Sequence, residues 1–202
     1  MTDLRTLLRG GDAVPAFRML LPQGWVAHRP DERGERQLLD AAAKKLAAAG
    51  RPELLAQLRA HASVAYRQLR EQRAFLVIMP GEGTPQALFL PATITGIERV
   101  DTPDAPVREV VIDAIRSKGA KPLDRAGMIV RWVERRDVAL DGEQTATTSI
   151  SYMIPIPGAE RRRAVQLTAV ITHPTDLPAD DEVLERWIAL IDTHVATFSW
   201  EP

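Results

Sequence analysis

Two neighbouring segments in the second half of the chain alternate apolar and polar residues with a period of two. They span residues 144–156 and 164–172, and the turn dipeptide Pro157-Gly158 lies between them. The residues predicted to face the core are Ile150, Tyr152, Ile154, Ile156, Val165, Leu167, Ala169 and Ile171. This period is typical of an antiparallel sheet with one covered face. A further strand at 128–138, followed by the turn Asp141-Gly142, completes a predicted antiparallel meander.

The other strand candidates lie in the first half of the chain, and the first of them ends in an unusual turn. Strands are predicted at residues 17–21, 25–28, 74–79 and 87–100. The last of these is expected to bend or break at Pro91. In FRMLLPQGW, Pro22 ends strand pairing because proline has no N–H to donate, and Gly24 permits a turn. We expect Trp25 to fold back and cap the core, since an aromatic side chain buries a large apolar area.

Helical spacing of apolar residues and capping signals predict the helices. They are expected at residues 2–9, 32–49, 52–73, 105–118 and 178–197. Gly50 suits a left-handed residue after a helix and Pro52 suits a first turn, so 32–49 and 52–73 should pair as a helical hairpin. The buried stripe predicted for the second helix of this hairpin is Leu54, Leu58, Ala62, Ala65 and Leu69. Ile115 is predicted on the buried side of 105–118.

Length, composition and element order together predict the fold class. We expect residues 1–202 to form a single α+β domain, a curved antiparallel sheet covered by helices, with the hairpin at 32–73 as an elaboration. The absence of cysteine excludes disulfides, iron–sulfur clusters and thiol catalysis. A formal charge of −1 argues against a general nucleic-acid binder. No signal peptide or apolar span is apparent, so a cytoplasmic location without membrane binding is the expectation.

Two parts of the chain resemble a known superfamily. FRMLLPQGW is similar to the first strand of PsbP-like proteins, and SISYMIPIPGAERRRAVQLTAVITHPTD followed by VLERWIALIDTHVATFSW is similar to their closing strands and final helix. The superfamily includes a photosystem extrinsic protein, a Ran-binding import factor and type VI secretion effector chaperones. The resemblance implies a curved antiparallel sheet sandwiched by helices. It also implies a role in binding other proteins rather than in catalysis.

No residue pattern predicts a catalytic, cofactor or metal site. GEGTPQ at 81–86 lacks the phosphate-loop spacing and is interpreted as a tight turn. His173 with Asp176 and Asp180 could in principle bind a metal, but without ligand spacing we predict none. His194 is interpreted as a packing residue, and Ser149 and Ser151 are placed on the outer face of a strand. Asp180, Asp181 and Glu182 are interpreted as charges that favour the N-terminus of the helix at 178–197. We therefore predict no cofactor.

Two basic clusters remain. Arg161, Arg162 and Arg163 follow a hairpin turn and are interpreted as a solvated tip. In the helix at 52–73, a face opposite the predicted stripe carries Arg59, Tyr66, Arg67 and Arg70. Tyrosine and arginine are enriched where proteins bind proteins, so these four residues form the predicted protein-binding surface. The alternative is an ordinary solvated helix face.

The functional hypothesis is a non-enzymatic, cytoplasmic adaptor or chaperone-like module linked to a bacterial secretion pathway. Its expected partner is another protein, and the sequence leaves open whether the chain forms a homo-oligomer. The alternative is a small-molecule-binding or hydrolytic protein with a pocket between the sheet and the helical hairpin. A deep apolar cleft with convergent polar groups would favour the alternative, and a filled core with an exposed patch would favour the adaptor.

Overall fold

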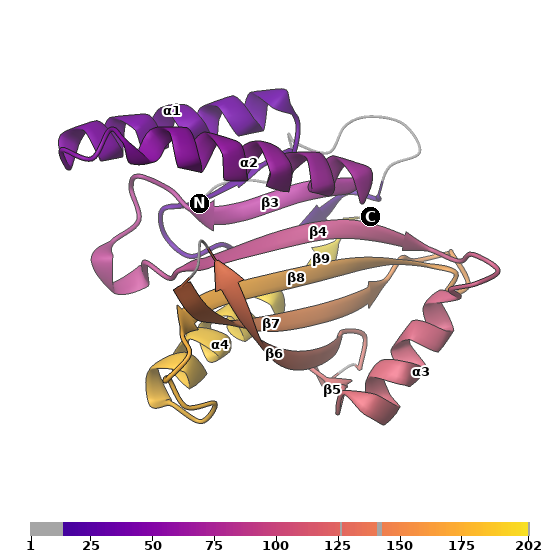
Figure 1. The fold of residues 1–202 in the computed structure, drawn as a ribbon. Helices are drawn as coiled ribbons and strands as arrows, with labels where there is room; N and C mark the ends of the chain where they lie inside the picture. The colour runs from indigo at the N-terminus through magenta and orange to yellow at the C-terminus, as the bar shows by residue number, and fades with distance from the viewer. Residues whose placement is uncertain (1–13, 126, 141–142, 202) are drawn as a thin grey trace.

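The main structural element is a seven-stranded antiparallel sheet, seen in a computed structural model that describes residues 14–125, 127–140 and 143–201 (Figure 1). In spatial order its strands are β2 (Trp25–His28), β3 (Ala74–Pro80), β4 (Ala92–Val100), β8 (Arg163–Pro174), β7 (Glu143–Pro155), β6 (Val130–Leu140) and β5 (Lys121–Pro122). Every neighbouring pair is antiparallel. The predicted antiparallel arrangement of the sheet is therefore confirmed.

The long strands β6, β7 and β8 form the meander that the two-residue period predicts. Ile150 lies opposite Val133 on β6 and Ala169 on β8, so apolar residues meet across three strands on one face. The turn between β7 and β8 contains Gly158, whose φ of 72° is in the left-handed region that glycine adopts easily. The turn predicted at Asp141-Gly142 lies outside the described residues.

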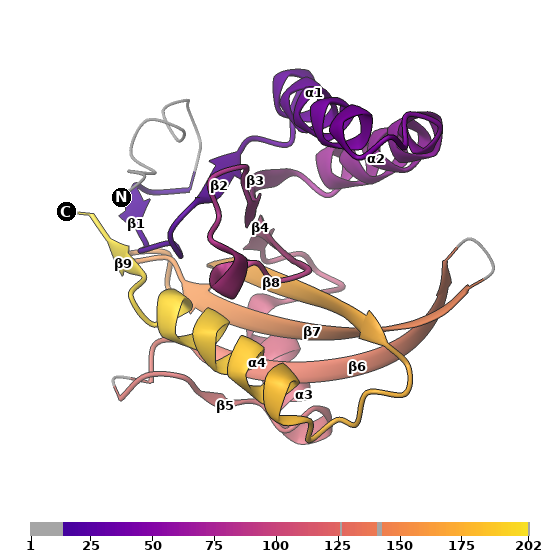
Figure 2. The ribbon, with the colours of Figure 1, turned by 90° about the vertical axis from the view of Figure 1, so that its left-hand side faces the viewer.

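Within the described residues, helices lie on both faces of the sheet. They are α1 (Glu32–Ala48), α2 (Leu54–Glu71), α3 (Val107–Ser117) and α4 (Glu182–Val195). In Figure 1, α4 lies behind the sheet, and in Figure 2 the α1–α2 hairpin and α4 lie on opposite sides of it. The α3 residues Val107 and Ala114 belong to a different core from the α4 residues, which places α3 on the face opposite to α4. The protein is thus an α+β sandwich, as expected. The helix predicted at 2–9 lies outside the described residues.

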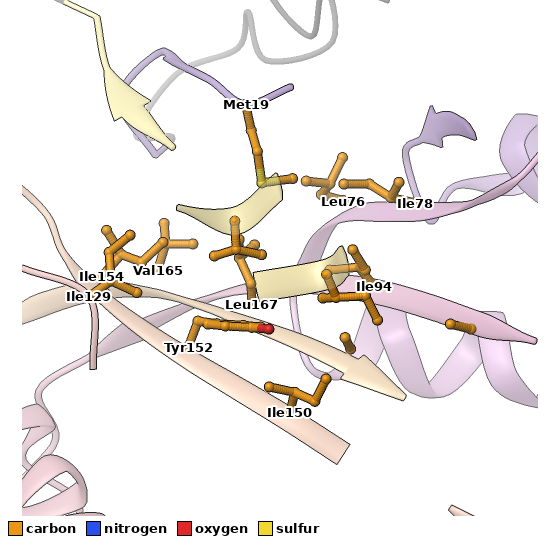
Figure 3. Close-up of a cluster of buried hydrophobic side chains, with 14 of the residues drawn as sticks. Met19, Leu76, Ile78, Ile94, Ile129, Ile150, Tyr152, Ile154, Val165 and Leu167 are labelled. Atoms are coloured by element: carbon orange, nitrogen blue, oxygen red, sulfur yellow. The ribbon is translucent and has the colours of Figure 1, made fainter. Parts of the chain in front are cut away.

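The main core lies between the sheet and α4. Inward side chains of β3, β4, β7 and β8 converge there, and Figure 3 shows Tyr152 and Leu167 among the surrounding isoleucines. All eight predicted core residues of the meander are buried. A second, smaller core forms on the opposite face, where Val107 and Ala114 of α3 pack with Trp132, Met153 and Ala164. Ile115, predicted on the buried side of α3, is instead 53% exposed because α3 turns it toward solvent.

The turn at Pro22–Trp25 has the predicted role. The Trp25 amide donates to the Pro22 carbonyl at 3.1 Å, and Gly24 has a φ of 83°. A Cβ on Gly24 would lie 2.5 Å from the Gly83 carbonyl oxygen, so this close approach requires glycine. Trp25 is 1% exposed in the main core, and its indole Nε1 donates to the Leu88 carbonyl at 3.2 Å. The chain therefore turns here to place one large aromatic side chain inside.

Two predicted strands differ from the structure. The first, expected at 17–21, is only β1 (Phe17–Arg18), and it pairs with β9 (Ser199–Trp200) in a separate two-stranded sheet. Phe17 stacks on Phe198 at 4.6 Å between ring centroids, which fixes this pairing. The strand expected at 87–100 begins only at Ala92, and a 3₁₀ turn, η2 (Gln86–Leu88), precedes it. Pro91 accounts for this late start, because it cannot donate a ladder hydrogen bond.

Candidate functional site

The α1–α2 hairpin meets the sheet through few buried residues. α2 runs along β3 (Figure 1), and its buried residues are Ala62 and Tyr66. Among the described residues of α1, Gly34 alone is buried. A Cβ on Gly34 would lie 2.1 Å from the Arg29 carbonyl oxygen, so α1 approaches the preceding chain closely at this point. Most of the hairpin therefore projects from the sheet instead of packing into it.

The leucines of the hairpin form a seam that stays partly accessible. None of them is fully buried: Leu38, Leu39, Leu46, Leu54, Leu55, Leu58 and Leu69 are all half-buried. By contrast, the shorter helix α4 buries Leu184, Ile191 and Val195 completely against the sheet. On α2, Val64 is also 43% exposed. The two hairpin helices thus leave part of their apolar surface accessible to solvent, whereas α4 buries its apolar face against the sheet.

Tyr66, expected on the exposed binding face, is buried. It is 3% exposed, and among the described residues its hydroxyl has no hydrogen-bond partner. Burial raises the pKa of the Tyr66 phenol, and the nearby carboxylates of Glu35 and Asp31 raise this pKa further. Tyr66 follows Ala62 by one helical turn, so both point to the sheet, whereas Ala65, predicted as buried, is exposed. The predicted stripe is therefore confirmed at Ala62 and wrong at Ala65, whose place beside the sheet is taken by Tyr66.

The three arginines of the predicted surface have different environments. Arg70 is paired, because its Nη1 lies 3.1 Å from Oε2 of Glu35 on α1. This pair links the two helices of the hairpin. Arg59 and Arg67 are exposed, and neither forms an ion pair with any described residue. We call Arg59 and Arg67 the basic face of α2; it is what remains of the predicted four-residue surface.

A cleft lies at the base of the hairpin, where the alternative hypothesis places a pocket. Its volume is about 530 Å³, within the range of small-molecule sites. The described residues that line it carry both signs of charge. The positive ones are Arg29, Arg70 and Arg73, and the negative ones are Asp31 and Glu98. None of these lining residues is a serine, threonine, histidine or tyrosine. The cleft could hold a polar ligand, but it offers no hydroxyl or imidazole for hydrolysis.

His173 is a packing residue rather than an available ligand. It is 3% exposed, its Nε2 lies 2.9 Å from the Thr148 hydroxyl, and its Nδ1 lies 2.9 Å from the Pro174 carbonyl oxygen. Both ring nitrogens are therefore engaged within the protein. No group of three potential metal ligands occurs within the described parts of the chain.

The other polar candidates have local structural contacts. Asp181 caps α4 by accepting from the Val183 amide at 2.8 Å, as its position predicts. His194 contacts the Leu20 carbonyl through Nδ1 at 3.1 Å. The loop at 81–86 contains a turn, in which the Thr84 amide donates to the Gly81 carbonyl at 3.3 Å. These contacts stabilise the fold and suggest no reaction.

One polar network was not anticipated from the sequence. The Tyr152 hydroxyl donates to Oδ1 of Asp192 at 2.6 Å, and Nε of Arg131 donates to the same oxygen at 3.0 Å. Tyr152 is fully buried, and burial together with Asp192 raises the pKa of its phenol. The network joins α4 to β6 and β7. The sequence did carry a signal for this network. Tyr152 alternates with inward isoleucines and Asp192 follows the buried Ile191, so both polar side chains need a partner inside the protein.

Comparisons with known proteins leave the family open. No family model and no curated protein matches this sequence. One similar solved structure is a protein from Bacteroides thetaiotaomicron, at 8% identity and a TM-score of 0.43, covering 92% of this chain. This chain spans only 45% of that protein. Another is LpqN of Mycobacterium tuberculosis, which is involved in cell envelope biogenesis, at 14% identity and a TM-score of 0.45, covering 95% of this chain and 87% of LpqN.

The length and apolar character of the helices show whether any of them could span a membrane. Among those that the structure describes, none has the length and apolar character to cross a bilayer.

Proposed function

We propose that the protein is a non-enzymatic adaptor or chaperone-like module that binds another protein through the α1–α2 hairpin. The observation that carries this proposal is the half-buried leucine seam of two helices of 17 and 18 residues. Helices in proteins gain most of their stability from burying an apolar face. A partner that covers this seam would supply the burial that the sheet does not.

The basic face of α2 indicates the kind of partner. Arg59 and Arg67 have no ionic partner among the described residues, whereas Arg70 is held by Glu35. Guanidinium groups of this kind bind carboxylates through paired hydrogen bonds. The proposed partner is therefore a protein with an acidic surface beside an apolar patch. A link to secretion and kinship with PsbP-like proteins are further parts of this proposal, and they rest on the sequence resemblance. The cytoplasmic location is also part of the proposal, and it rests on the sequence pattern alone.

The test begins with a partner captured from the native organism and then purified. Titration calorimetry would compare the wild type with Arg59→Glu/Arg67→Glu. We expect at least tenfold weaker binding and an unfolding free energy changed by no more than about 0.5 kcal/mol for each exposed position. Arg116→Glu is the matched control, because Arg116 is exposed on α3, likewise has no ion pair among the described residues, and lies away from the hairpin.

A second variant tests the apolar part of the site. Val64→Asp places a charge on exposed hairpin surface without opening the core. It should also weaken binding while leaving the melting temperature nearly unchanged. Full binding by both the charge-reversal and the Val64→Asp variants would contradict the proposed site.

A second candidate function is the binding of a small polar ligand in the cleft at the hairpin base. The cleft volume of about 530 Å³ supports it, together with the three arginines in its lining. Arg73→Glu would test it without altering Arg59 or Arg67. Loss of ligand binding in that variant, with protein capture intact, would favour the cleft over the hairpin surface.

A further inference from the structure

A second pocket lies on the same face of the sheet as the hairpin, but at the opposite end, beside α3. It opens between α3 and the ends of β6, β7 and β8, near the turn that joins β7 to β8, and α3 is seen below that turn in Figure 1. Its volume is about 390 Å³, within the range of small-molecule sites. No hairpin residue lines it, so a ligand in this pocket would bind independently of the proposed protein partner.

The interior of this pocket is apolar. Val111 of α3, Val130 of β6 and Met153 of β7 line it, together with Val107 and Ala164. Three of these residues, Val107, Met153 and Ala164, belong to the smaller core under α3. The pocket is therefore a gap at the edge of that core. An aliphatic group could enter it and extend the packing already present.

The rim of the pocket is cationic. It carries Arg108, Arg161 and Arg163, and the described lining residues include no carboxylate. Arg163 is already paired, since its Nε lies 2.6 Å from Oε1 of Glu98. Arg108 and Arg161 are exposed and form no ion pair with a described residue. The first amide of α3 is bound by the Asp101 carboxylate at 2.7 Å, so the positive character of the rim comes from the arginines and not from the helix end.

We propose that this pocket binds a small amphipathic anion, an aliphatic carboxylate. Its hydrocarbon chain would lie between α3 and the strands β6 and β7. Its carboxylate would be held at the rim by the guanidinium groups of Arg108 and Arg161, which suit the planar, two-oxygen geometry of this group. The arginine tip interpreted from the sequence as solvated surface is, on this proposal, part of a binding site.

The proposal is tested by titration calorimetry with hexanoate and octanoate below micelle-forming concentrations. Each methylene that leaves water strengthens binding about fourfold, so octanoate should bind up to about fifteenfold more tightly than hexanoate. Octan-1-ol and octylamine test the charge requirement. Both should bind at least fivefold more weakly than octanoate, because the alcohol lacks the anion and the amine is repelled by the arginines.

Variants then locate the site. Arg108→Gln and Arg161→Gln should each weaken octanoate binding about fivefold. The control is Arg162→Gln, in the same turn, because Arg162 pairs with Glu160 and does not line the pocket. Val111→Phe should fill the pocket and abolish binding, while circular dichroism and melting confirm the fold. The proposal is overturned if octanoate shows no saturable binding, if octan-1-ol binds equally well, or if the Arg108, Arg161 and Arg162 variants behave alike.

Discussion

Replacing Tyr66 by phenylalanine should stabilise the protein, although it removes a polar group from the hairpin. The Tyr66 side chain is 3% exposed, and its hydroxyl has no hydrogen-bond partner among the described residues. A buried hydroxyl without a partner costs about 1–3 kcal/mol. Phenylalanine keeps the ring and its packing against the sheet, so the unfolding free energy of Tyr66→Phe should rise by about 1 kcal/mol.

Urea unfolding at neutral pH, followed by far-ultraviolet circular dichroism, measures this difference. The matched control is Tyr152→Phe, which removes a hydroxyl that donates to Asp192 at 2.6 Å. That variant should lose about 1–2 kcal/mol, because a hydrogen bond to a charged group is lost. The two tyrosine variants, identical in chemistry, are thus expected to shift stability in opposite directions.

Alkaline titration gives an independent measure of Tyr66. Burial raises its pKa above the ordinary value of 10.0, so the unfolded chain releases the phenolic proton first as the pH rises. Stability linked to Tyr66 is therefore complete below pH 10.0 and falls above it. Between about pH 9.5 and 11, Tyr66→Phe should lose less stability than the wild type. If Tyr66→Phe is destabilised by about 1 kcal/mol or more at neutral pH, the hydroxyl has a partner and this reasoning is wrong.

Trp25→Ala should lose about 3–5 kcal/mol of unfolding free energy in a urea titration, because a fully buried indole leaves a cavity; an unchanged midpoint would contradict its role in the core. Asp192→Ala should lose about 2–3 kcal/mol, since it leaves the buried Tyr152 hydroxyl and Arg131 without their acceptor, and its loss should exceed that of Tyr152→Phe. Burial lowers the pKa of His194 below 6.5, partly opposed by the Leu20 carbonyl, so its neutral form contributes stability above pH 6.5 that is lost as the pH falls through the folded pKa. His194→Gln should flatten this acid limb in melts between about pH 7.5 and 5. Elemental analysis of protein purified without added metal should find no stoichiometric zinc or iron, and a stoichiometric amount of either would refute the predicted absence of a metal site.

The elements that the sequence predicts well are those with strong local signals. Alternation in 144–156 and 164–172 predicts the strands, their inward faces and the turn at Gly158. Gly24 and Pro22 predict the turn that buries Trp25, because the requirement for glycine and the missing proline N–H are local properties. These features depend little on which other part of the chain lies nearby.

The features that were missed depend on distant partners. Ala65 and Tyr66 are neighbours on α2, and the helical period alone does not reveal which of the two faces the sheet beside Ala62. β1 pairs with β9 at the far end of the chain, and no local pattern specifies that pairing. The acceptor for Tyr152 lies on α4, 40 residues further along. Only the folded arrangement brings these groups together.

The pairing of β1 with β9 has a mechanical consequence. The strands are antiparallel, with Phe17 opposite Trp200 and Arg18 opposite Ser199, so the incoming end of β1 lies beside the outgoing end of β9. Tension applied through these two ends would load the hydrogen bonds one after another, as in a zipper, instead of shearing them together. This small sheet should therefore open before the seven-stranded sheet, which begins at β2, and expose the aromatic rings of Phe17, Phe198 and Trp200.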